Sequence, residues 1–175
     1  RETQTLRDTL RADAGEARAG AGSVSVRRAG EPDADALVEL NDQLARHIGS
    51  SPVFFPDSRG NDAAGWREWL ADNDHIALLA ERDGQTLGYI KAQGPAFDVS
   101  YAVHDEHDLG INGMFVTEEA RRLRVGAVLL GELAAAAEKL GKTMISVDFE
   151  SSNREARGFW LRWFEPVTHS FERRL

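Results

Sequence analysis

A strand joined to a long helix by a short, arginine-rich turn is the feature that most restricts how this chain can fold. Residues 109–116 (LGINGMFV) predict the strand and residues 121–140 predict the helix. The apolar side chains of that helix recur at helical spacing: Val125, Leu129, Leu133, Ala136 and Leu140. Gly141 is a natural stop, because glycine adopts the left-handed conformation that ends many helices. Together these elements predict an α/β domain.

A hairpin precedes this unit at residues 75–93. Its turn is Asp83-Gly84, a dipeptide that favours the tight turn between two antiparallel strands. Further strands are predicted by apolar and alternating runs at residues 23–28, 143–149 and 166–175. The predicted order along the chain is β-α-α-β-β-β-α-β-α-β.

Three further helices complete this order. Pro32 and Asp33 open the first, whose apolar stripe is Leu37, Leu40, Leu44 and Ile48. The second is short and contains Trp66, Trp69 and Leu70. The third follows a capping segment at Ser151–Asn153. Residues 1–22 contain few large apolar side chains and are expected to form a tail or linker, which leaves the domain in residues 23–175.

Composition excludes several classes of function. The chain has 175 residues and a net charge of −8, which argues against general nucleic-acid binding, because phosphate contacts need a basic surface. It contains no cysteine, which excludes disulfides and thiolate metal sites and fits a cytoplasmic location. No apolar run is long enough to span a membrane. A soluble domain is therefore expected.

The turn before the long helix is suited to phosphate binding. Backbone N–H groups at a helix start lack partners within the helix, and the helix dipole favours negative charge there. Gly126 has no Cβ, so a ligand can approach the backbone closely. Three arginines can add bidentate phosphate contacts: Arg121, Arg122 and Arg124. The alternative is that they only offset Glu118 and Glu119 on a solvated turn, and the local pattern fits both interpretations.

Two sequence motifs, one before the long helix and one near the C-terminal end of the chain, point to a known family when they are taken together. The first is Val116 followed by RRLRVG at residues 121–126. The second is SVDFESSNREARGFWLRWF, with Asn153, Ala156 and the pair Phe159-Trp160. Together they resemble the GNAT superfamily of acyl-CoA N-acyltransferases, which has Arg/Gln-x-x-Gly-x-Gly/Ala after a strand ending in valine and, further on, an asparagine, an alanine and an aromatic pair. The resemblance covers residues 23–175.

This resemblance implies a GNAT-like α/β fold, a mixed, mostly antiparallel sheet with splayed central strands flanked by helices. The splayed strands would be 109–116 and 143–149, with the thioester of acetyl-CoA between them. Strand backbone would hold the pantetheine arm at Met114, Phe115 and Val116. Backbone N–H groups of the turn would hold the pyrophosphate at Arg121, Arg122, Leu123, Arg124, Val125, Gly126 and Ala127. Asn153 would contact the pantetheine or cap the helix after it.

Three positions depart from the family pattern. Arg124 replaces the first glycine of the acyl-CoA motif, so its side chain must leave the phosphate path. Trp160 replaces a tyrosine that often protonates the leaving thiolate, and Asn112 replaces a frequent glutamate. The side chains of Trp160 and Asn112 cannot act as an acid or base. Glu150 is the leading candidate for the base, and the others are Asp148, His104 and His107.

Two loop features have ordinary alternatives. Residues 104–108 (HDEHD) are expected to be a solvated loop, and no metal site is predicted there. Four aromatic residues are candidates for an acceptor pocket, although core or covering positions suit them as well: Phe54, Phe55, Trp66 and Tyr101.

The resemblance implies an N-acetyltransferase that moves the acetyl group of acetyl-CoA to an amine. Attack would be direct, because the chain has no cysteine nucleophile. The acceptor would be a small molecule or peptide and the protein a candidate homodimer, with no metal, nucleic-acid or membrane partner. Two alternatives are a non-catalytic acyl-CoA-binding sensor, favoured by Trp160 and Asn112, and one half of a tandem GNAT protein with residues 1–22 as connector.

Overall fold

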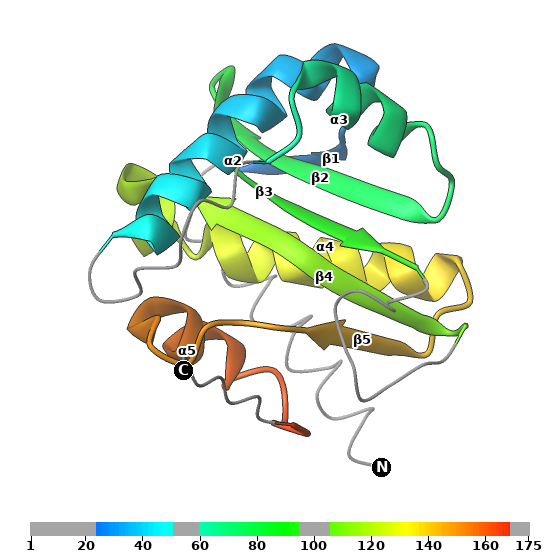
Figure 1. The fold of residues 1–175 in the computed structure, drawn as a ribbon, viewed down its shortest axis with the longest axis vertical. Coiled ribbons are helices and arrows are strands. Elements are labelled where there is room, and N and C mark those ends of the chain that lie inside the picture. Colours follow the sequence, from blue (N-terminus) through cyan, green and yellow to red (C-terminus); the bar gives the residue numbers. More distant parts are fainter. Residues whose placement is uncertain (1–23, 51–59, 95–105, 169–175) are drawn as a thin grey trace, which may run out of the picture.

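The computed structural model describes residues 24–50, 60–94 and 106–168. Within them, five strands form one sheet in the order β1-β2-β3-β4-β5 (Figure 1). The strands are β1 (Ser25–Arg28), β2 (His75–Arg82), β3 (Gln85–Gln93), β4 (Asp108–Val116) and β5 (Met144–Val147). The first four pair antiparallel, and β5 pairs parallel with β4. The expected mixed, mostly antiparallel α/β sheet is confirmed.

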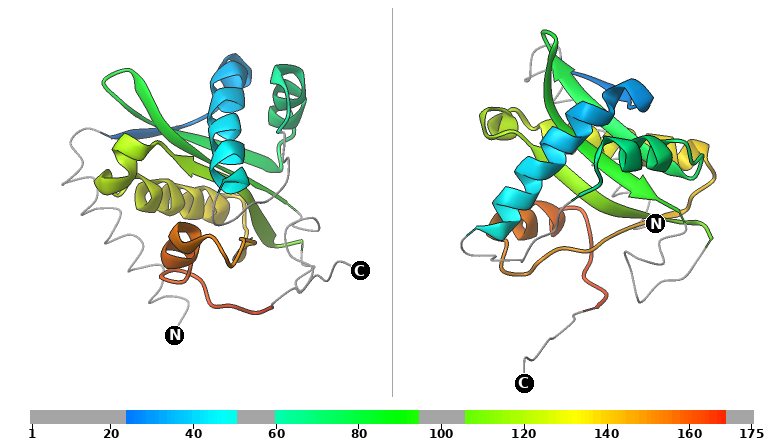
Figure 2. Two further views of the ribbon diagram at one scale, coloured as in Figure 1. Left: turned by 60° about the vertical axis from the view of Figure 1, so that its left-hand side comes forward. Right: turned by 45° about the horizontal axis from the view of Figure 1, so that its top comes forward.

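Helices cover both faces of this sheet. They are α2 (Ala34–Gly49), α3 (Ala63–Leu70), α4 (Val125–Lys139) and α5 (Arg154–Trp160), with two 3-10 turns, η1 (Glu31–Asp33) and η2 (Glu118–Leu123). Figure 2 shows α2 and α3 on one face and α4 on the other. Leu37 and Trp66 pack on the first face against Tyr89 of β3, whereas Leu129 and Leu133 of α4 lie in the core of the second. The sheet therefore separates two apolar cores.

The hairpin turn forms where the sequence predicts it. Asp83 and Gly84 have φ angles of 53° and 77°, so both central residues are left-handed. This is the conformation that a two-residue turn needs to match the twist of its flanking strands. The turn fixes the register of β2 against β3, the middle strand of the described sheet.

Three predicted boundaries were wrong. The helix predicted from residue 121 begins at Val125, because η2 and the left-handed Arg124 come first. Leu140 is 47% exposed, because it caps the end of α4 instead of joining the core. Of the predicted closing strand, residues 166–168 are not in a strand, since Pro166 has no N–H to donate.

Several predictions lie outside the described residues: the tail 1–22, the rest of the closing strand, Phe54, Phe55, Tyr101 and His104. Among the helices that the structure describes, none has both the length and the apolar character to cross a membrane.

Candidate functional site

The two strands β4 and β5 run side by side and then separate. Their pairing begins at Asp108 and Met144 and ends at Ile111 and Val147. β4 continues to Val116, whereas the chain after β5 leaves the sheet toward α5 (Figure 1). Along the described chain, one edge of residues 112–116 therefore has no neighbouring strand. We call this opening the β4/β5 gap.

Backbone groups of β4 line the β4/β5 gap. The N–H of Thr117 donates to the carbonyl of Leu87 at 2.9 Å, on the β3 side. Residues of an antiparallel strand alternate in the side to which their N–H and C=O groups point. Met114 and Val116 therefore direct these groups into the gap, and Phe115 directs its own toward β3. Of the three strand residues expected to hold a ligand, two are oriented for it.

A β-bulge marks the point where the strands separate. Lys91 of β3 lies opposite Gly113 and Ala92 lies opposite Ile111, so Asn112 is the extra residue. A bulge bends its strand and increases the local twist, which helps β4 to turn away from β5. The Asn112 amide donates to Gln93 Oε1 at 2.6 Å, so the residue in place of the family's glutamate is part of an amide pair.

The first turn of α4 lies at the open end of the gap. A Cβ on Gly126 would stand 2.8 Å from Met114 Cε and 3.1 Å from a ring carbon of Phe159. Gly126 therefore lies between Met114 of β4 and Phe159 of α5. Its lack of a side chain lets these two residues pack closely against α4, in addition to leaving the backbone open to a ligand. The unpaired N–H groups and positive dipole end of α4 are directed to the same end.

The backbone conformation at Arg124 is one that favours glycine, the residue that the GNAT pattern has at this position. Its φ of 57° and ψ of 20° are left-handed, and it joins η2 to α4. That conformation costs a residue with a side chain about 1–2 kcal/mol, and glycine avoids this cost. The Arg124 side chain is exposed, so it leaves the backbone path clear, as the sequence required.

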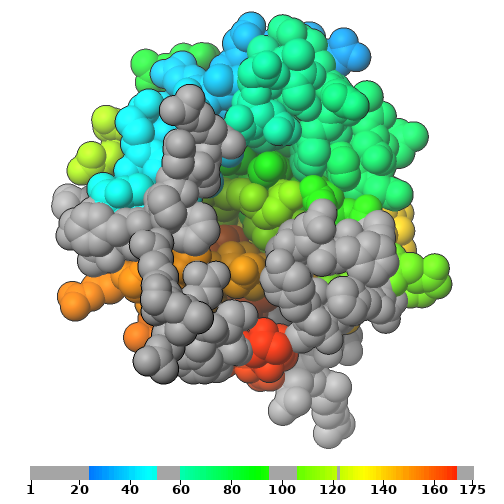
Figure 3. Space-filling view, in the orientation of Figure 1, coloured from blue at the N-terminus to red at the C-terminus, as the bar shows by residue number. Residues whose placement is uncertain are grey.

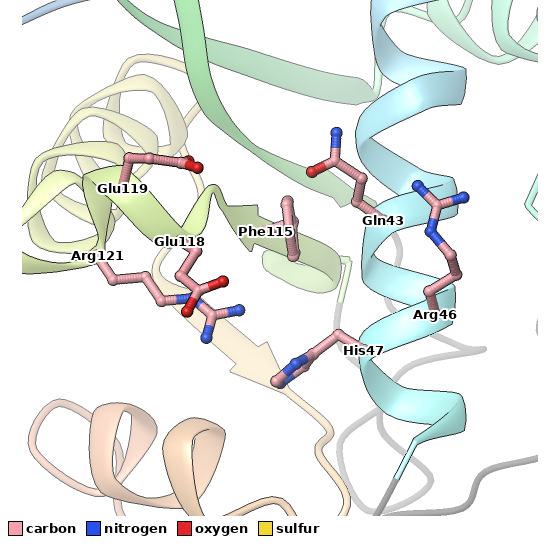
Figure 4. A pocket seen from close by; sticks show the side chains of 7 residues that line it. All are labelled: Gln43, Arg46, His47, Phe115, Glu118, Glu119 and Arg121. Atoms are coloured by element: carbon pink, nitrogen blue, oxygen red, sulfur yellow. The ribbon is translucent and has the colours of Figure 1, made fainter.

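A pocket of about 410 Å³ lies between α2 and the turn after β4 (Figure 4). Its lining residues are Gln43, Arg46, His47, Phe115, Glu118, Glu119 and Arg121. Figure 4 shows Arg121 of η2 and His47 of α2 pointing toward each other across it. The lining carries charges of both signs, so it suits a polar ligand.

Arg121 already has partners in the protein. Its guanidinium donates to Glu155 Oε2 of α5 at 2.9 Å and to the Val116 carbonyl at 3.3 Å. Glu155 Oε2 also lies 3.5 Å from His47 Nε2. Arg121 therefore forms an ion pair, as one of the two interpretations of the turn expected. Its carboxylate partner is Glu155, 34 positions along the chain, and not Glu118 or Glu119. The side chains of Leu123, Val125 and Ala127 are partly or fully buried, so these positions can offer a ligand only backbone.

Asn153 caps α5. Its Oδ1 accepts a hydrogen bond from the Ala156 N–H at 3.1 Å, and the residue is only 9% exposed. One of its two predicted uses is thus confirmed.

We expect Asn153→Ala to lower the free energy of unfolding by about 1 kcal/mol, because an orphan N–H loses its acceptor. Asn153→Asp should retain most of the stability, since the carboxylate can accept the same bond. Urea unfolding measures both variants. Equal stability of Asn153→Ala and the wild type would show that the cap contributes nothing.

The candidate bases lie at different ends of the gap. Asp148 and Glu150 are exposed and follow β5, on the open side. His107 precedes β4, and its carbonyl accepts the Thr143 N–H at 3.0 Å where the two strands are still paired. Their place at the open end of the gap makes Asp148 and Glu150 better candidates for the base than His107. Among residues 24–50, 60–94 and 106–168, no group of three His, Asp or Glu residues is placed to hold a metal ion.

Trp160 belongs to the core on the α4 face. It is 6% exposed, and its ring contacts those of Phe159 and Phe164 edge-on, with centroids 4.9 and 5.6 Å away. The residue at the family's tyrosine position therefore has a packing function.

Comparison with known sequences identifies the family. The sequence model of the acetyltransferase (GNAT) family matches residues 38–164. Since this is well over half of the sequence, the chain belongs to the acetyltransferase (GNAT) family. No curated protein shows a significant match.

Solved structures share the fold. AAC(6')-Iy in complex with the bisubstrate analogue CoA-S-monomethyl-acetylneamine has a TM-score of 0.69 at 17% identity, over 88% of this chain and 99% of that one. Aminoglycoside 6'-N-acetyltransferase AAC(6')-Ih from Acinetobacter baumannii has a TM-score of 0.65 at 17% identity, over 87% and 99%. A ribosomal-protein-alanine N-acetyltransferase from Brucella melitensis has a TM-score of 0.62 at 16% identity, over 87% and 99%. At such identities the likeness shows the fold alone.

Proposed function

We propose that this protein transfers an acetyl group from acetyl-CoA to an amine. The observation that carries the proposal is the β4/β5 gap, with backbone of Met114 and Val116 on its wall and the start of α4 at its mouth. An extended pantetheine arm can hydrogen-bond to such an edge as a further strand would. Its pyrophosphate would then meet the N–H groups of residues 121–127 and the dipole of α4.

The chain's own groups supply placement and polarisation. The gap-facing N–H of Met114 can donate to the thioester oxygen, where negative charge develops as the amine nitrogen attacks. The C–N bond forms, the C–S bond breaks, and the CoA thiolate leaves. The proton of the amine passes to a carboxylate at the open end, with Glu150 the leading candidate, and the thiolate takes a proton from water. Little further chemistry is required once both reactants are held in place.

One measurement tests the proposal directly. The purified protein is incubated with acetyl-CoA and a panel of amines, and release of free CoA thiol is followed. We expect thiol release that depends on the amine. Acetyl-CoA binding with no turnover of any amine would instead support a sensor, which is favoured by Trp160 in the core and the amide of Asn112 at the bulge.

The Arg121–Glu155 pair gives a test of the pyrophosphate site. The side chains are 33% and 62% exposed, so the pair is weak and a phosphate can replace its carboxylate. We expect Arg121→Ala to weaken CoA binding about 10- to 100-fold through loss of a charge-assisted hydrogen bond. Glu155→Gln should strengthen binding up to about five-fold, because Arg121 is released from its competitor.

Calorimetric titration with CoA and with dephospho-CoA checks both variants, and the second ligand removes any contribution of the 3'-phosphate. If neither variant changes the affinity for either ligand, Arg121 serves only to balance charge on the surface.

A further inference from the structure

A cation lies on the open face of the sheet beside the β4/β5 gap. Lys91 projects from β3 to the face that α2 and α3 cover, next to the bulge in β4. Its Nζ stands 4.9 Å from the ring centre of Trp66 and 5.4 Å from that of Trp69, both on α3. Its Cε lies 2.8 Å from the position that a Cβ on Gly113 would occupy. The side chain thus crosses over β4, the wall of the gap.

This part of the sheet is reachable from outside. Asn112 is exposed, and Lys91, Gln93 and Gly113 are partly exposed, although β3 and β4 are central strands. Figure 3 shows β3, β4 and β5 at the bottom of a hollow on the face that carries α2 and α3. The opposite face is filled by α4 and its core. An acceptor that meets a thioester in the gap must therefore approach over Lys91.

Within residues 24–50, 60–94 and 106–168, the Lys91 ammonium has no counter-charge. No carboxylate in the described part of the chain forms an ion pair with it, and its Nζ lies over the aromatic rings of Trp66 and Trp69. The Tyr89 hydroxyl also lies over Gly113, but it donates to Asn41 Oδ1 at 2.9 Å, and burial raises the pKa of this phenol above its usual range. Burial lowers the pKa of Lys91, because desolvation penalises the charged form. An anion from outside would offset that cost.

Neutral hydrogen-bonding groups complete the surface. Gln93 Oε1 accepts from Asn112 Nδ2 at 2.6 Å and from Trp69 Nε1 at 3.2 Å, which fixes both amides. Beneath this surface, the fully buried indole N–H of Trp66 has no partner among the described residues. Beside Lys91, the described residues of this surface thus offer one cation and several neutral donors.

We infer that Lys91 binds a carboxylate or similar anionic group of the acceptor, so that the preferred substrate is an amine that also carries an acidic group. This inference rests on the proposed transfer to an amine. It sets the acceptor apart from the polycationic aminoglycosides named for two of the structural neighbours. Like charges at Lys91 would repel such a polyamine, whereas an amino acid or an acidic peptide supplies the missing anion.

The test compares ω-amino acids with their carboxamides, since the distant carboxylate leaves the amine's own pKa nearly the same. We expect the wild type to favour the acid over the amide about 10- to 100-fold in kcat/KM, mainly through KM. Lys91→Met, of similar length, should remove this preference, and Lys91→Glu should reverse it toward diamines. Lys139→Met is the matched control, because Lys139 lies on the exposed surface of α4, and this variant should keep the preference for the acid over the amide.

Equal use of acid and amide by the wild type, or an unchanged preference in Lys91→Met, would overturn the inference. If the protein acetylates no amine in the panel, calorimetry with the same acids in the presence of CoA decides the matter. Binding that Lys91→Met loses and Lys139→Met keeps supports the anion site while the transferase proposal fails. No binding of acids to the wild type overturns the site.

Discussion

Replacing Gly126 with valine is expected to weaken CoA binding at least about 100-fold, which corresponds to ~2.7 kcal/mol. The new side chain would press on Met114 and Phe159, at the place where the first turn of α4 meets the open end of the β4/β5 gap. It would obstruct the backbone approach or displace Met114, whose N–H and C=O line the gap. Valine does not weaken the helix itself, because glycine has the lower helix propensity of the two.

Calorimetry on folded protein measures this effect, and two further variants separate binding from packing. Gly158→Val is the matched control, since a Cβ at Gly158 of α5 meets nothing within 4 Å, and its affinity should equal that of the wild type. Met114→Ala combined with Gly126→Val removes the nearest contact, so stability should recover while affinity stays low. Wild-type affinity in a folded Gly126→Val protein would place the CoA site elsewhere.

Replacing Glu150 with glutamine is expected to lower kcat/KM by roughly 10²- to 10⁴-fold, the usual contribution of a general base. An alkylamine with a pKa near roughly 10.4 is mostly protonated at neutral pH, so deprotonation is the harder requirement of the reaction. The rate of the variant should therefore depend on free amine in solution, and its pH–rate profile should shift to higher pH. CoA affinity should stay near the wild-type value.

Asp148→Asn is the comparison, because Asp148 is also exposed at the open end of the gap. Full pH–rate profiles of both variants with one accepted amine distinguish them. A wild-type rate for Glu150→Gln at every pH, together with a slow Asp148→Asn, would transfer the assignment to Asp148. Two unaffected variants would leave water as the proton acceptor.

Local signals predicted the parts of the fold that depend on neighbouring residues. Asp83-Gly84 gave the hairpin because both residues tolerate positive φ, and the stripe at Val125, Leu129 and Leu133 gave the buried face of α4. The sequence predicted a capping segment at Ser151–Asn153 and left Asn153 as a cap or a pantetheine contact; the structure shows the cap, because its Oδ1 accepts the N–H of Ala156 three residues later.

The remaining features depend on contacts that are remote in sequence. The bulge at Asn112 follows from the register of β4 against β3, which residues 109–116 alone do not determine. The break before α4 was missed because the left-handed residue is Arg124, where glycine would have been the recognisable signal. Arg121 was assigned to phosphate or to Glu118 and Glu119, whereas its carboxylate partner comes from α5. An anion-binding role for Lys91 could not be inferred from the sequence, because it depends on the packing of Lys91 of β3 against the Trp66 ring of α3.

The parting of β4 from β5 also has a consequence for self-association. The separation of the last two strands of the described sheet leaves an unpaired edge on β4, and such edges can template pairing with another chain. In this protein the Arg121 guanidinium occupies the Val116 carbonyl on that edge, and its ion pair with Glu155 holds α5 alongside. Arg121, which we assign to ligand binding, thus also covers this strand edge, and its contacts with Val116 and Glu155 protect the edge from pairing with a second chain.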